Sequence, residues 1–461
     1  MSSYSLYNEF KTKTKLQSEN RKLHSTLNKS LNNYQTKYSS GVAQFSNLDA
    51  FREKLKFIRT KAVLNLEKNL LQFETNFIKN GGELFWADTA EDVYQIIQHL
   101  LTDKTNIVSV KSKSMATEEI DLNLFLENND IQVTETDLGE YIVQLRDEKP
   151  SHITAPALHL SKEEIALLFH ENFNLKPDAN AEEITEYVRE ILRKKFTSAE
   201  LGISGANFLI ADSGSIALTE NEGNASLVTS WPKFHIAIAG IDKVISNYAD
   251  LSIIWPMLSS HATGQKISVY NHIISGPQQE EEGDGPEKMF VILLNNGRDN
   301  LLKDKELRQS LHCIKCGACS NTCPVYKILS GHSYGSVYNG PIGSITTPHL
   351  KENENHFHLS FASSLCAKCS EICPVKIPLD ELLLYNRALA VKNEKIPKSE
   401  IRSIKLLTRI LKSRKRMNMG SAGIRKLVFK IVFRKKWGVY RANPDFPKQS
   451  FNKIKRKQQL L

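Results

Sequence analysis

The chain has 461 residues, of which 41% are hydrophobic and 24% are charged, so it is long enough for two or three domains with buried cores. Its first residues lack the charged and apolar layout of a signal peptide, and no segment approaches the ~20 apolar residues that cross a bilayer. These features argue against a secreted or membrane-spanning protein. We therefore expect a cytoplasmic protein, in which thiols stay reduced.

The net charge of +10 is unevenly distributed along the chain. Residues 391–461 contain 22 Lys and Arg against three acidic residues, so this segment carries +19 and the remaining 390 residues carry −9. Apolar residues recur at helical spacing within this basic tail, from Ile404 to Leu411 and from Ile424 to Val432. Such helices suit peripheral contact with anionic membrane at its inner face or an acidic partner, and a simply solvated helix is the alternative. No recognition motif favours nucleic acid.

The order of predicted elements divides the chain into a helical segment at 1–75, an α/β domain at 76–300, a cysteine-rich domain at 301–395 and the basic tail at 396–461. In the first segment, Leu16, Leu23, Leu27 and Leu31 recur at four- and seven-residue steps, which predicts packing helices.

The α/β domain is predicted from the alternation of apolar bursts with amphipathic helices. We expect strands at 83–87, 106–110, 131–135, 207–211, 215–218, 233–239, 266–274 and 289–294. Helices are expected at 90–101 and 118–127. Capping boxes that pair Ser161 with Glu164 and Asn180 with Glu183 predict the starts of two more helices.

Two polar stretches of this domain could do chemistry. Lys111 to Ser114 join a strand to a helix, where lysines and backbone amides could hold an anion, or where the loop is merely solvated. Glu135, Asp137 and Glu140 follow another strand. They could act in acid-base catalysis, although such carboxylates more often cap the next helix.

The remaining polar residues of this domain favour simpler explanations. A hairpin turn accounts for Asp212 and Gly214. Glu220 to Asn224 form a second polar turn. No metal-ligand spacing links His152, His159 and His235, so the sequence assigns them no chemistry.

The seven cysteines all lie between residues 313 and 373. The first motif matches the bacterial ferredoxin pattern C-x2-C-x2-C-x3-C-P, with Cys313, Cys316, Cys319 and Cys323 before Pro324. Two-residue gaps let successive thiolates wrap one face of a cubane cluster, while Gly317 allows close backbone approach. The second motif contains Cys366, Cys369 and Cys373 and also ends in a proline. The sequence therefore predicts two iron-sulfur clusters.

In the ferredoxin pattern the last cysteine of each motif reaches the other cluster. Cluster 1 is then expected to be held by Cys313, Cys316, Cys319 and Cys373, and cluster 2 by Cys323, Cys366 and Cys369. Cluster 2 is one cysteine short, and Ser363 stands where its first cysteine is expected. Serine, a water or another side chain could complete the site, or the site could hold a three-iron cluster.

Disulfides and structural zinc are the alternatives for these cysteines. Disulfides are disfavoured because seven is an odd number and nothing marks the chain as secreted. Zinc takes four ligands, usually in C-x2-C pairs, and would leave three cysteines without a role.

Two stretches together resemble the lactate-utilisation iron-sulfur protein B family. The segment 202–223, GISGANFLIADSGSIALTENEG, is similar to the signature of the lactate-utilisation domain. The second motif, with SLC before Cys369 and CPVKI after it, is similar to that family's incomplete motif. The resemblance spans nearly the whole chain and implies that the missing cysteine is a family trait.

The resemblance implies an α/β domain like those of ribose-5-phosphate isomerase and CoA-transferases, followed by a mostly α-helical two-cluster ferredoxin-type domain. It implies two clusters, most often [4Fe-4S], and electron transfer in the oxidation of L-lactate to pyruvate, which allows growth on lactate. The implied partners are a cysteine-rich protein and a second lactate-utilisation-domain protein.

No residue pattern identifies a catalytic group of the chain's own, which favours an electron carrier. The rival hypothesis makes the α/β domain an enzyme that acts on a CoA- or phosphate-bearing substrate. It would use Glu135 or Glu220 together with the anion loop, and the clusters would be redox accessories.

Overall fold

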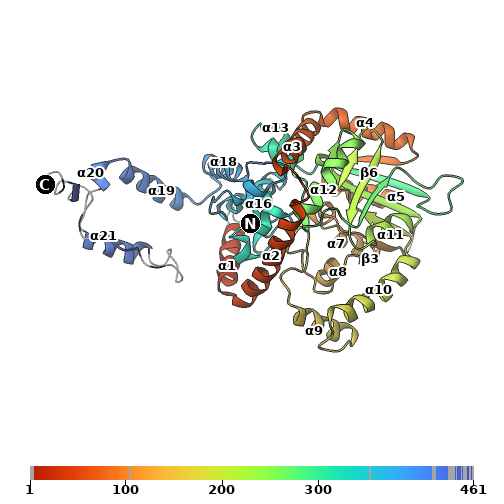
Figure 1. The fold of residues 1–461 in the computed structure, drawn as a ribbon, viewed down its shortest axis with the longest axis horizontal. Coiled ribbons are helices and arrows are strands. Elements are labelled where there is room, and N and C mark those ends of the chain that lie inside the picture. Colours follow the sequence, from red (N-terminus) through yellow and green to blue (C-terminus); the bar gives the residue numbers. More distant parts are fainter. Residues whose placement is uncertain are drawn as a thin grey trace. The chain divides into compact units, whose positions relative to one another are not determined.

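The structure is a computed structural model that describes residues 5–102, 104, 106–351, 355–417, 422–433, 442, 444–447, 449, 454–455 and 458. The chain forms two units, Met1–Lys395 and Ile396–Leu461. The first unit contains the N-terminal helices, the α/β domain and the cysteine-rich domain (Figure 1).

The α/β domain is built on a six-stranded parallel sheet with the order β1-β10-β7-β4-β2-β3. Its strands are β1 (Glu83–Ala87), β2 (Val108–Lys111), β3 (Gln132–Glu135), β4 (Leu201–Ser204), β7 (Phe234–Gly240) and β10 (Lys288–Leu294). The connection from β3 to β4 crosses over β2. After β2 the chain therefore continues toward one edge of the sheet, and after β4 it continues toward the other edge. Ligands of open parallel sheets bind at such a switch point, outside the carboxyl ends of the strands.

Both faces of this sheet are buried, because residues that alternate along each strand enter two different cores. In β7, Ile236 and Ile238 pack with α5 (Ala90–Leu100) on one face. Ala237 and Ala239 of the same strand pack on the other face with α4 (Leu66–Lys79). This double burial explains the continuous apolar sequence of the central strands.

A second sheet of four strands has the order β8-β5-β6-β9. Its members are β5 (Phe208–Ile210), β6 (Ser215–Glu220), β8 (Val244–Ile245) and β9 (Tyr270–Ile274). Leu209 and Ile216 pack into the same core as α4, so this sheet covers one face of the parallel sheet.

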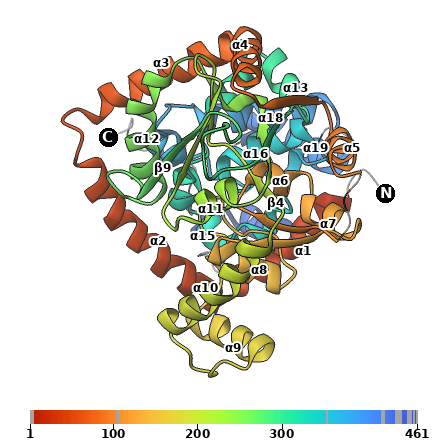
Figure 2. The ribbon, with the colours of Figure 1, turned by 90° about the vertical axis from the view of Figure 1, so that its right-hand side faces the viewer.

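The remaining helices of the α/β domain are α6 (Met115–Glu119), α7 (Leu122–Glu127), α8 (Leu138–Leu145), α9 (Lys162–Phe173), α10 (Ala181–Ser198), α11 (Asn224–Ser230) and α12 (Leu251–Ala262). The capping boxes predicted at Ser161 and Asn180 are confirmed and open α9 and α10. These two helices lie together at one end of the domain (Figure 2).

The predicted N-terminal helices are confirmed as α1 (Ser5–Glu19), α2 (Arg21–Val42), α3 (Leu48–Leu64) and α4. Leu23, Leu27 and Leu31 of α2 are buried against Tyr326 and Cys323 of the cysteine-rich domain. The two ends of the first unit, far apart in sequence, therefore share one hydrophobic core.

The cysteine-rich domain is mostly helical. It contains α13 (Arg298–Lys303), α14 (Ala318–Thr322), α15 (Tyr326–Leu329), α16 (Gly340–Leu350), α17 (Lys368–Ile372) and α18 (Leu379–Lys392). The second unit contains α19 (Lys398–Leu411), α20 (Arg414–Met417) and α21 (Ala422–Val428).

Candidate iron-sulfur site and an adjoining cavity

The two cysteine motifs fold as a structural repeat, with the second displaced by 50 residues from the first. Lys315 and Gly317 have φ of 58° and 73°, and the equivalent Leu365 and Ala367 have φ of 54° and 62°. The first pair leads into the short helix α14 and the second into the short helix α17. These two helices pack against each other. Gly317 fits because a Cβ there would lie 3.1 Å from His152 Cε1.

The structure brings together the four cysteines that the ferredoxin pattern assigns to cluster 1. Cys313, Cys316 and Cys319 of the first motif and Cys373 of the second line one small cavity, whose other walls include Ile314, Ile342 and Val375. Backbone N–H groups point at these sulfurs: Lys315 N donates to Cys313 Sγ at 3.3 Å and Ile377 N donates to Cys373 Sγ at 3.4 Å. Four thiols in an apolar, N–H-lined cavity fit a [4Fe-4S] cluster.

The second group contains Cys323, Cys366 and Cys369, together with Ser363. Burial and the neighbouring Cys366 raise the pKa of Cys323, and burial and the neighbouring Cys323 raise that of Cys369. Leu365 N donates to Ser363 Oγ at 3.1 Å, which is the same bond that Lys315 N makes to Cys313 Sγ in the first motif. The serine oxygen therefore occupies the position of the missing sulfur.

Burial changes the acidity of most of these thiols. It raises the pKa of Cys373 to about 11 and that of Cys369 to about 12, and it raises the pKa values of Cys316 and Cys319 as well. Cys366 is exposed, and a hydrogen bond from the Lys368 backbone lowers its pKa. The buried thiols hold their protons at neutral pH until a metal replaces them.

Two arginines of α3 tie the N-terminal helices to both motifs. The fully buried Arg59 donates to the carbonyl oxygens of Leu311 and His312, directly before Cys313, and to those of Asp242 and Val244 in the α/β domain. Arg52 donates to the carbonyl oxygens of Glu371 and Cys373 at the end of α17. The helices that the sequence predicted only as packing elements thus position the cysteine loops.

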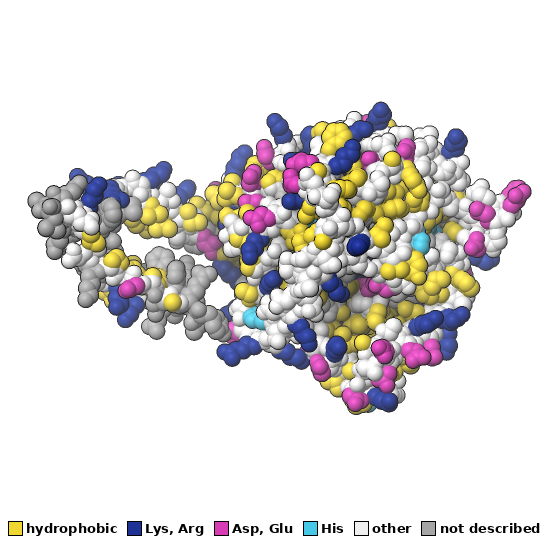
Figure 3. Space-filling view, viewed as in Figure 1, with side chains coloured by type: hydrophobic (Ala, Val, Ile, Leu, Met, Phe, Trp, Pro, Cys, Tyr) yellow, Lys and Arg dark blue, Asp and Glu magenta, His cyan; other side chains and the backbone are white. Residues whose placement is uncertain are grey.

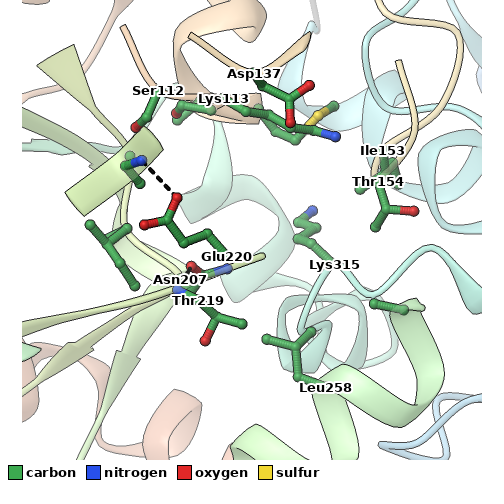
Figure 4. A pocket seen from close by; sticks show the side chains of 18 of the residues that line it. Ser112, Lys113, Asp137, Ile153, Thr154, Asn207, Thr219, Glu220, Leu258 and Lys315 are labelled. Carbon is green, nitrogen blue, oxygen red and sulfur yellow. Dashed lines mark hydrogen bonds between the residues drawn. The ribbon is translucent and has the colours of Figure 1, made fainter. Parts of the chain in front are cut away.

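A cavity of about 280 Å³ adjoins the cluster 1 loop, at the carboxyl ends of β2, β4 and β7. Its walls include the segments that follow these strands, residues of β6 and α12, and Lys315, which precedes Cys316. The segments are close together because Gly205 has no Cβ, which would lie 2.5 Å from Ser114 Oγ. In the close-up view, Lys315 and Glu220 extend from opposite sides of this cavity (Figure 4).

The cations of the cavity differ in how they are paired. Arg298 is buried and binds the carboxylates of Glu119 and Asp242, at 2.7 Å each. The ammonium nitrogens of Lys113, Lys243 and Lys315 have no carboxylate oxygen of the described residues within 4.0 Å, so these lysines form no ion pair there. Burial lowers the pKa of Lys243 to about 8. The negative charge of Asp242 acts to raise this pKa, and the positive charge of Lys315 acts to lower it. Lys315 Nζ lies 4.2 Å from the centre of the Tyr338 ring.

Three carboxylates of the cavity are held by hydrogen-bond donors. Glu220 accepts from the backbone N–H groups of Ala225 and Ser226 and contacts His272 Nε2 at 3.1 Å. Asp137 accepts from Glu140 N as the N-cap of α8. Glu222 accepts from Asn221 N. Asp137 and Glu220 are two of the candidates from the sequence, and the cavity brings them together with Ser112, Lys113 and Ser114 of the predicted anion loop.

The structure places other sequence candidates away from this cavity. Lys111 is completely buried and forms ion pairs with Glu118 and Glu135 at 2.7 Å each, so it is not available to hold an anion. Glu135 Oε1 also accepts a hydrogen bond from Asn123 Nδ2 at 2.8 Å, and burial raises the pKa of Glu135. Glu140 is also buried, which raises its pKa. Glu135 and Glu140 belong to the core rather than to the cavity.

Asp212 and two of the histidines are likewise structural. Asp212 lies in the turn between the antiparallel strands β5 and β6, as predicted, and also accepts a hydrogen bond from Tyr248 N. His235 is buried beside Ser204 Oγ at 2.8 Å, and burial lowers its pKa to about 3. His152 is buried next to the cluster 1 loop, where its Nδ1 accepts from Thr154 N. Burial also lowers the pKa of His152 to about 3.

His159 meets Glu148 and His332 in a group that the sequence spacing did not reveal. The ligand atoms of these three residues lie within 4.8 Å of one another. Arg146 already binds Glu148 Oε1 at 2.7 Å, and His332 Nε2 contacts Lys149 O at 2.7 Å. Glu148 and His332 therefore already have protein partners, whereas the buried Nδ1 of His159 has no hydrogen-bond partner among the described residues.

The tail helix α19 is amphipathic and exposed. Its basic residues recur every three or four positions, at Lys398, Arg402, Lys405, Arg409 and Lys412. Ile404, Leu407 and Leu411 fall on another face and are 53%, 50% and 55% exposed. The two kinds of side chain follow different sides of the helix (Figure 3). Among the described residues, no helix combines the length and apolarity that a membrane crossing requires.

Comparison with known proteins assigns a family to each domain. Residues 70–294 match the LUD domain family, and residues 309–377 match the 4Fe-4S dicluster domain family. The chain is thus a LUD-domain protein fused to a ferredoxin-type iron-sulfur domain.

Curated relatives are similar to most of this chain. The chain is 44% identical over 360 residues to Lactate utilization protein B of Bacillus subtilis (strain 168), covering 78% of this chain and 75% of the relative. It is 43% identical over 371 residues to the protein of the same name from Shouchella clausii (strain KSM-K16), covering 80% and 78%. The chain therefore belongs to the lactate utilization protein B family.

One solved structure is also similar, a DUF162 family protein from Deinococcus radiodurans. It is 14% identical with a TM-score of 0.28, and the match covers 50% of this chain and 98% of that chain.

Proposed function

We propose that this iron-sulfur protein of lactate utilisation transfers electrons in the oxidation of L-lactate to pyruvate. The observation that carries the proposal is the grouping of Cys373 with Cys313, Cys316 and Cys319 around one cavity. Ligands exchanged between two motifs bring two redox centres close together, as in two-cluster ferredoxins. Oxidation of lactate releases two electrons and two protons, and the seven cysteines provide for two one-electron centres.

The proposed cofactors are two [4Fe-4S] clusters. Cys313, Cys316, Cys319 and Cys373 would hold the first, and Cys323, Cys366 and Cys369 the second, with Ser363 Oγ in the eighth ligand position. When bound, the clusters supply reversible one-electron transfer. The protein's own contribution is to exclude water from the first site with apolar walls and to direct backbone N–H groups at its sulfurs.

The proposed partners are a cysteine-rich protein and a second lactate-utilisation-domain protein. The α/β domain would share its fold with ribose-5-phosphate isomerase and CoA-transferases. The rival hypothesis, an enzymatic α/β domain, loses Glu135 to a buried ion pair and keeps only Glu220 at the cavity.

Iron content and reduction by lactate test the electron-transfer proposal. Anaerobically purified protein should contain about eight irons, the count for two cubane clusters. L-lactate should reduce the clusters when both partners are present, and not without them. Cys373→Ala should lose about half of the iron, because it removes a ligand of cluster 1. Stoichiometric zinc in place of iron, or clusters that lactate and both partners leave oxidised, would overturn the proposal.

The exposed α19 supports a second role, peripheral attachment to anionic membrane on the cytoplasmic side. A basic face beside an apolar face allows lysines and arginines to meet anionic headgroups while leucines and isoleucines enter the boundary of the acyl chains. This role concerns location and is independent of the redox chemistry.

A further inference from the structure

The walls of the cavity beside cluster 1 include three parts of the chain that are far apart in sequence. Ser112 to Met115 follow β2, Gly205 to Asn207 follow β4, and Lys315 comes from the cysteine loop. The switch point of a parallel sheet is where ligands bind, and this cavity lies there.

The charges of the cavity favour an anion. Its carboxylates already accept hydrogen bonds from backbone N–H groups, and Arg298 is neutralised by Glu119 and Asp242. Lys113, Lys243 and Lys315 have no carboxylate within ion-pair distance among the described residues. An unpaired ammonium in a partly buried site is costly, and an anionic ligand would relieve that cost.

The size of the cavity favours a small ligand. Its volume of about 280 Å³ is at the lower limit of ligand pockets, which span ~300–1,000 Å³. Glu220 stands across from Lys315 and can accept a hydrogen bond from a ligand hydroxyl (Figure 4). Lysines on one side and a fixed carboxylate on the other match a molecule that carries both a carboxylate and a hydroxyl.

We infer that this cavity binds a small 2-hydroxy acid or its 2-oxo product, with the ligand carboxylate on Lys243 and Lys315 and, in the hydroxy acid, the hydroxyl toward Glu220. The inference rests on the proposed function for the identity of the acid. Occupancy of the cavity is sensed at cluster 1, because the same Lys315 donates its backbone N–H to Cys313 Sγ. Lys315 is thus a binding residue in the loop of a predicted cluster.

Direct binding to the full-length, cluster-loaded protein tests this inference without any enzymatic assay. Calorimetric titrations under anaerobic conditions would use L-lactate, pyruvate, inorganic phosphate and lactamide, the uncharged analogue of lactate. We expect lactate or pyruvate to bind. Lactamide should bind at least about tenfold more weakly because it lacks the charged carboxylate, and phosphate should do so because its oxygens are placed differently.

Substitutions identify the binding residues. Lys243→Gln and Lys315→Gln should each weaken lactate or pyruvate binding about tenfold or more. Lys305→Gln removes the same charge from an exposed position of the cysteine-rich domain and should leave binding unchanged. The ligand should also alter the EPR spectrum of the reduced clusters in the unsubstituted protein, and not in Lys315→Gln. Iron content and circular dichroism show whether each variant has folded.

Several results would overturn the inference. If phosphate bound as tightly as lactate and pyruvate, the cavity would be a general anion site. Equal binding of lactamide, or an equal loss in Lys305→Gln, would show that the lysines are not the cause. The protein could also hold about eight irons and accept electrons through its partners, yet bind none of these ligands. That result would refute this inference alone, and the proposed function would stand.

Discussion

Ser363 decides how the second cluster would be completed. Its hydroxyl oxygen accepts the N–H of Leu365, and Cys313 accepts the N–H of Lys315 in the equivalent place. Arg387 donates to the Ser363 carbonyl oxygen at 2.8 Å, which fixes the loop. An oxygen ligand in place of sulfur changes the charge distribution around a cluster, which is one of the levers on its potential.

Substitution of Ser363 should change the iron content of one cluster. Ser363→Ala removes the only ligand that the loop offers at this position, so about one iron should be lost and a three-iron EPR signal should appear in the oxidised protein. Ser363→Cys should retain about eight irons and shift the potential of one cluster. Iron analysis and EPR measure both. An unchanged spectrum in Ser363→Ala would show that the serine is not a ligand.

Lys111 and Glu135 are two residues whose roles were predicted wrongly from the sequence. As parts of a polar loop and of a carboxylate group, they were candidates for an anion site and for acid-base chemistry. In the parallel pairing of β2 with β3 the two residues are direct neighbours, and they form a buried ion pair. Pairing register of parallel strands depends on tertiary structure, so local sequence could not reveal this contact.

Elements with strong local signals could be predicted well. Both capping boxes are formed, and the strand expected at 83–87 is β1. The buried strand β4 was missed because its four residues include Gly202 and show no alternation. Gly202 is required by packing rather than by the strand itself, since a Cβ there would lie 2.0 Å from the carbonyl oxygen of Val228 in α11.

Helix α3 was predicted from its apolar spacing, but the role of its arginines was not. Arg59 is a single charged residue within an apolar stripe, and sequence cannot show that four carbonyl oxygens surround it. Those carbonyls come from the α/β domain and from the start of the first cysteine motif. The helix therefore links the two domains through the backbone next to Cys313.

Removal of the Arg59 guanidinium should destabilise this link strongly. Arg59→Met fills the volume but leaves buried carbonyls without donors, which should lower the free energy of unfolding by about 3–5 kcal/mol. Urea unfolding followed by circular dichroism measures the loss, and release of iron to a chelator should become faster. Lys56→Met, at an exposed position of the same helix, is the matched control. Equal unfolding midpoints for the two variants would contradict the prediction.

At the scale of the whole molecule, the ligand cavity depends on contacts between segments that are about 200 residues apart, such as Ser112 and Lys315. The sequence pointed to Ser112–Ser114 and to Glu220 separately, and to the cysteine motif as a third feature. It could not show that they share one cavity, because only the sheet order and the docking of the cysteine loop bring them together.

The tail should bind anionic membrane through α19. Full-length protein should sediment with vesicles that contain phosphatidylglycerol and not with neutral phosphatidylcholine vesicles, and salt should weaken the binding. A Lys or Arg near an anionic surface contributes about 1 kcal/mol, so Lys405→Gln combined with Arg409→Gln should weaken binding about thirtyfold.

Two controls separate this mechanism from general electrostatic attraction. Arg189→Gln combined with Lys194→Gln removes the same charge from exposed positions of α10, and this variant should bind as the unsubstituted protein does. Leu407→Asn combined with Leu411→Asn keeps every charge of α19 but removes apolar area that would be buried in the membrane, so it should also weaken binding. If protein truncated before Lys398 bound the vesicles as well as the full chain did, the tail would have no part in membrane attachment.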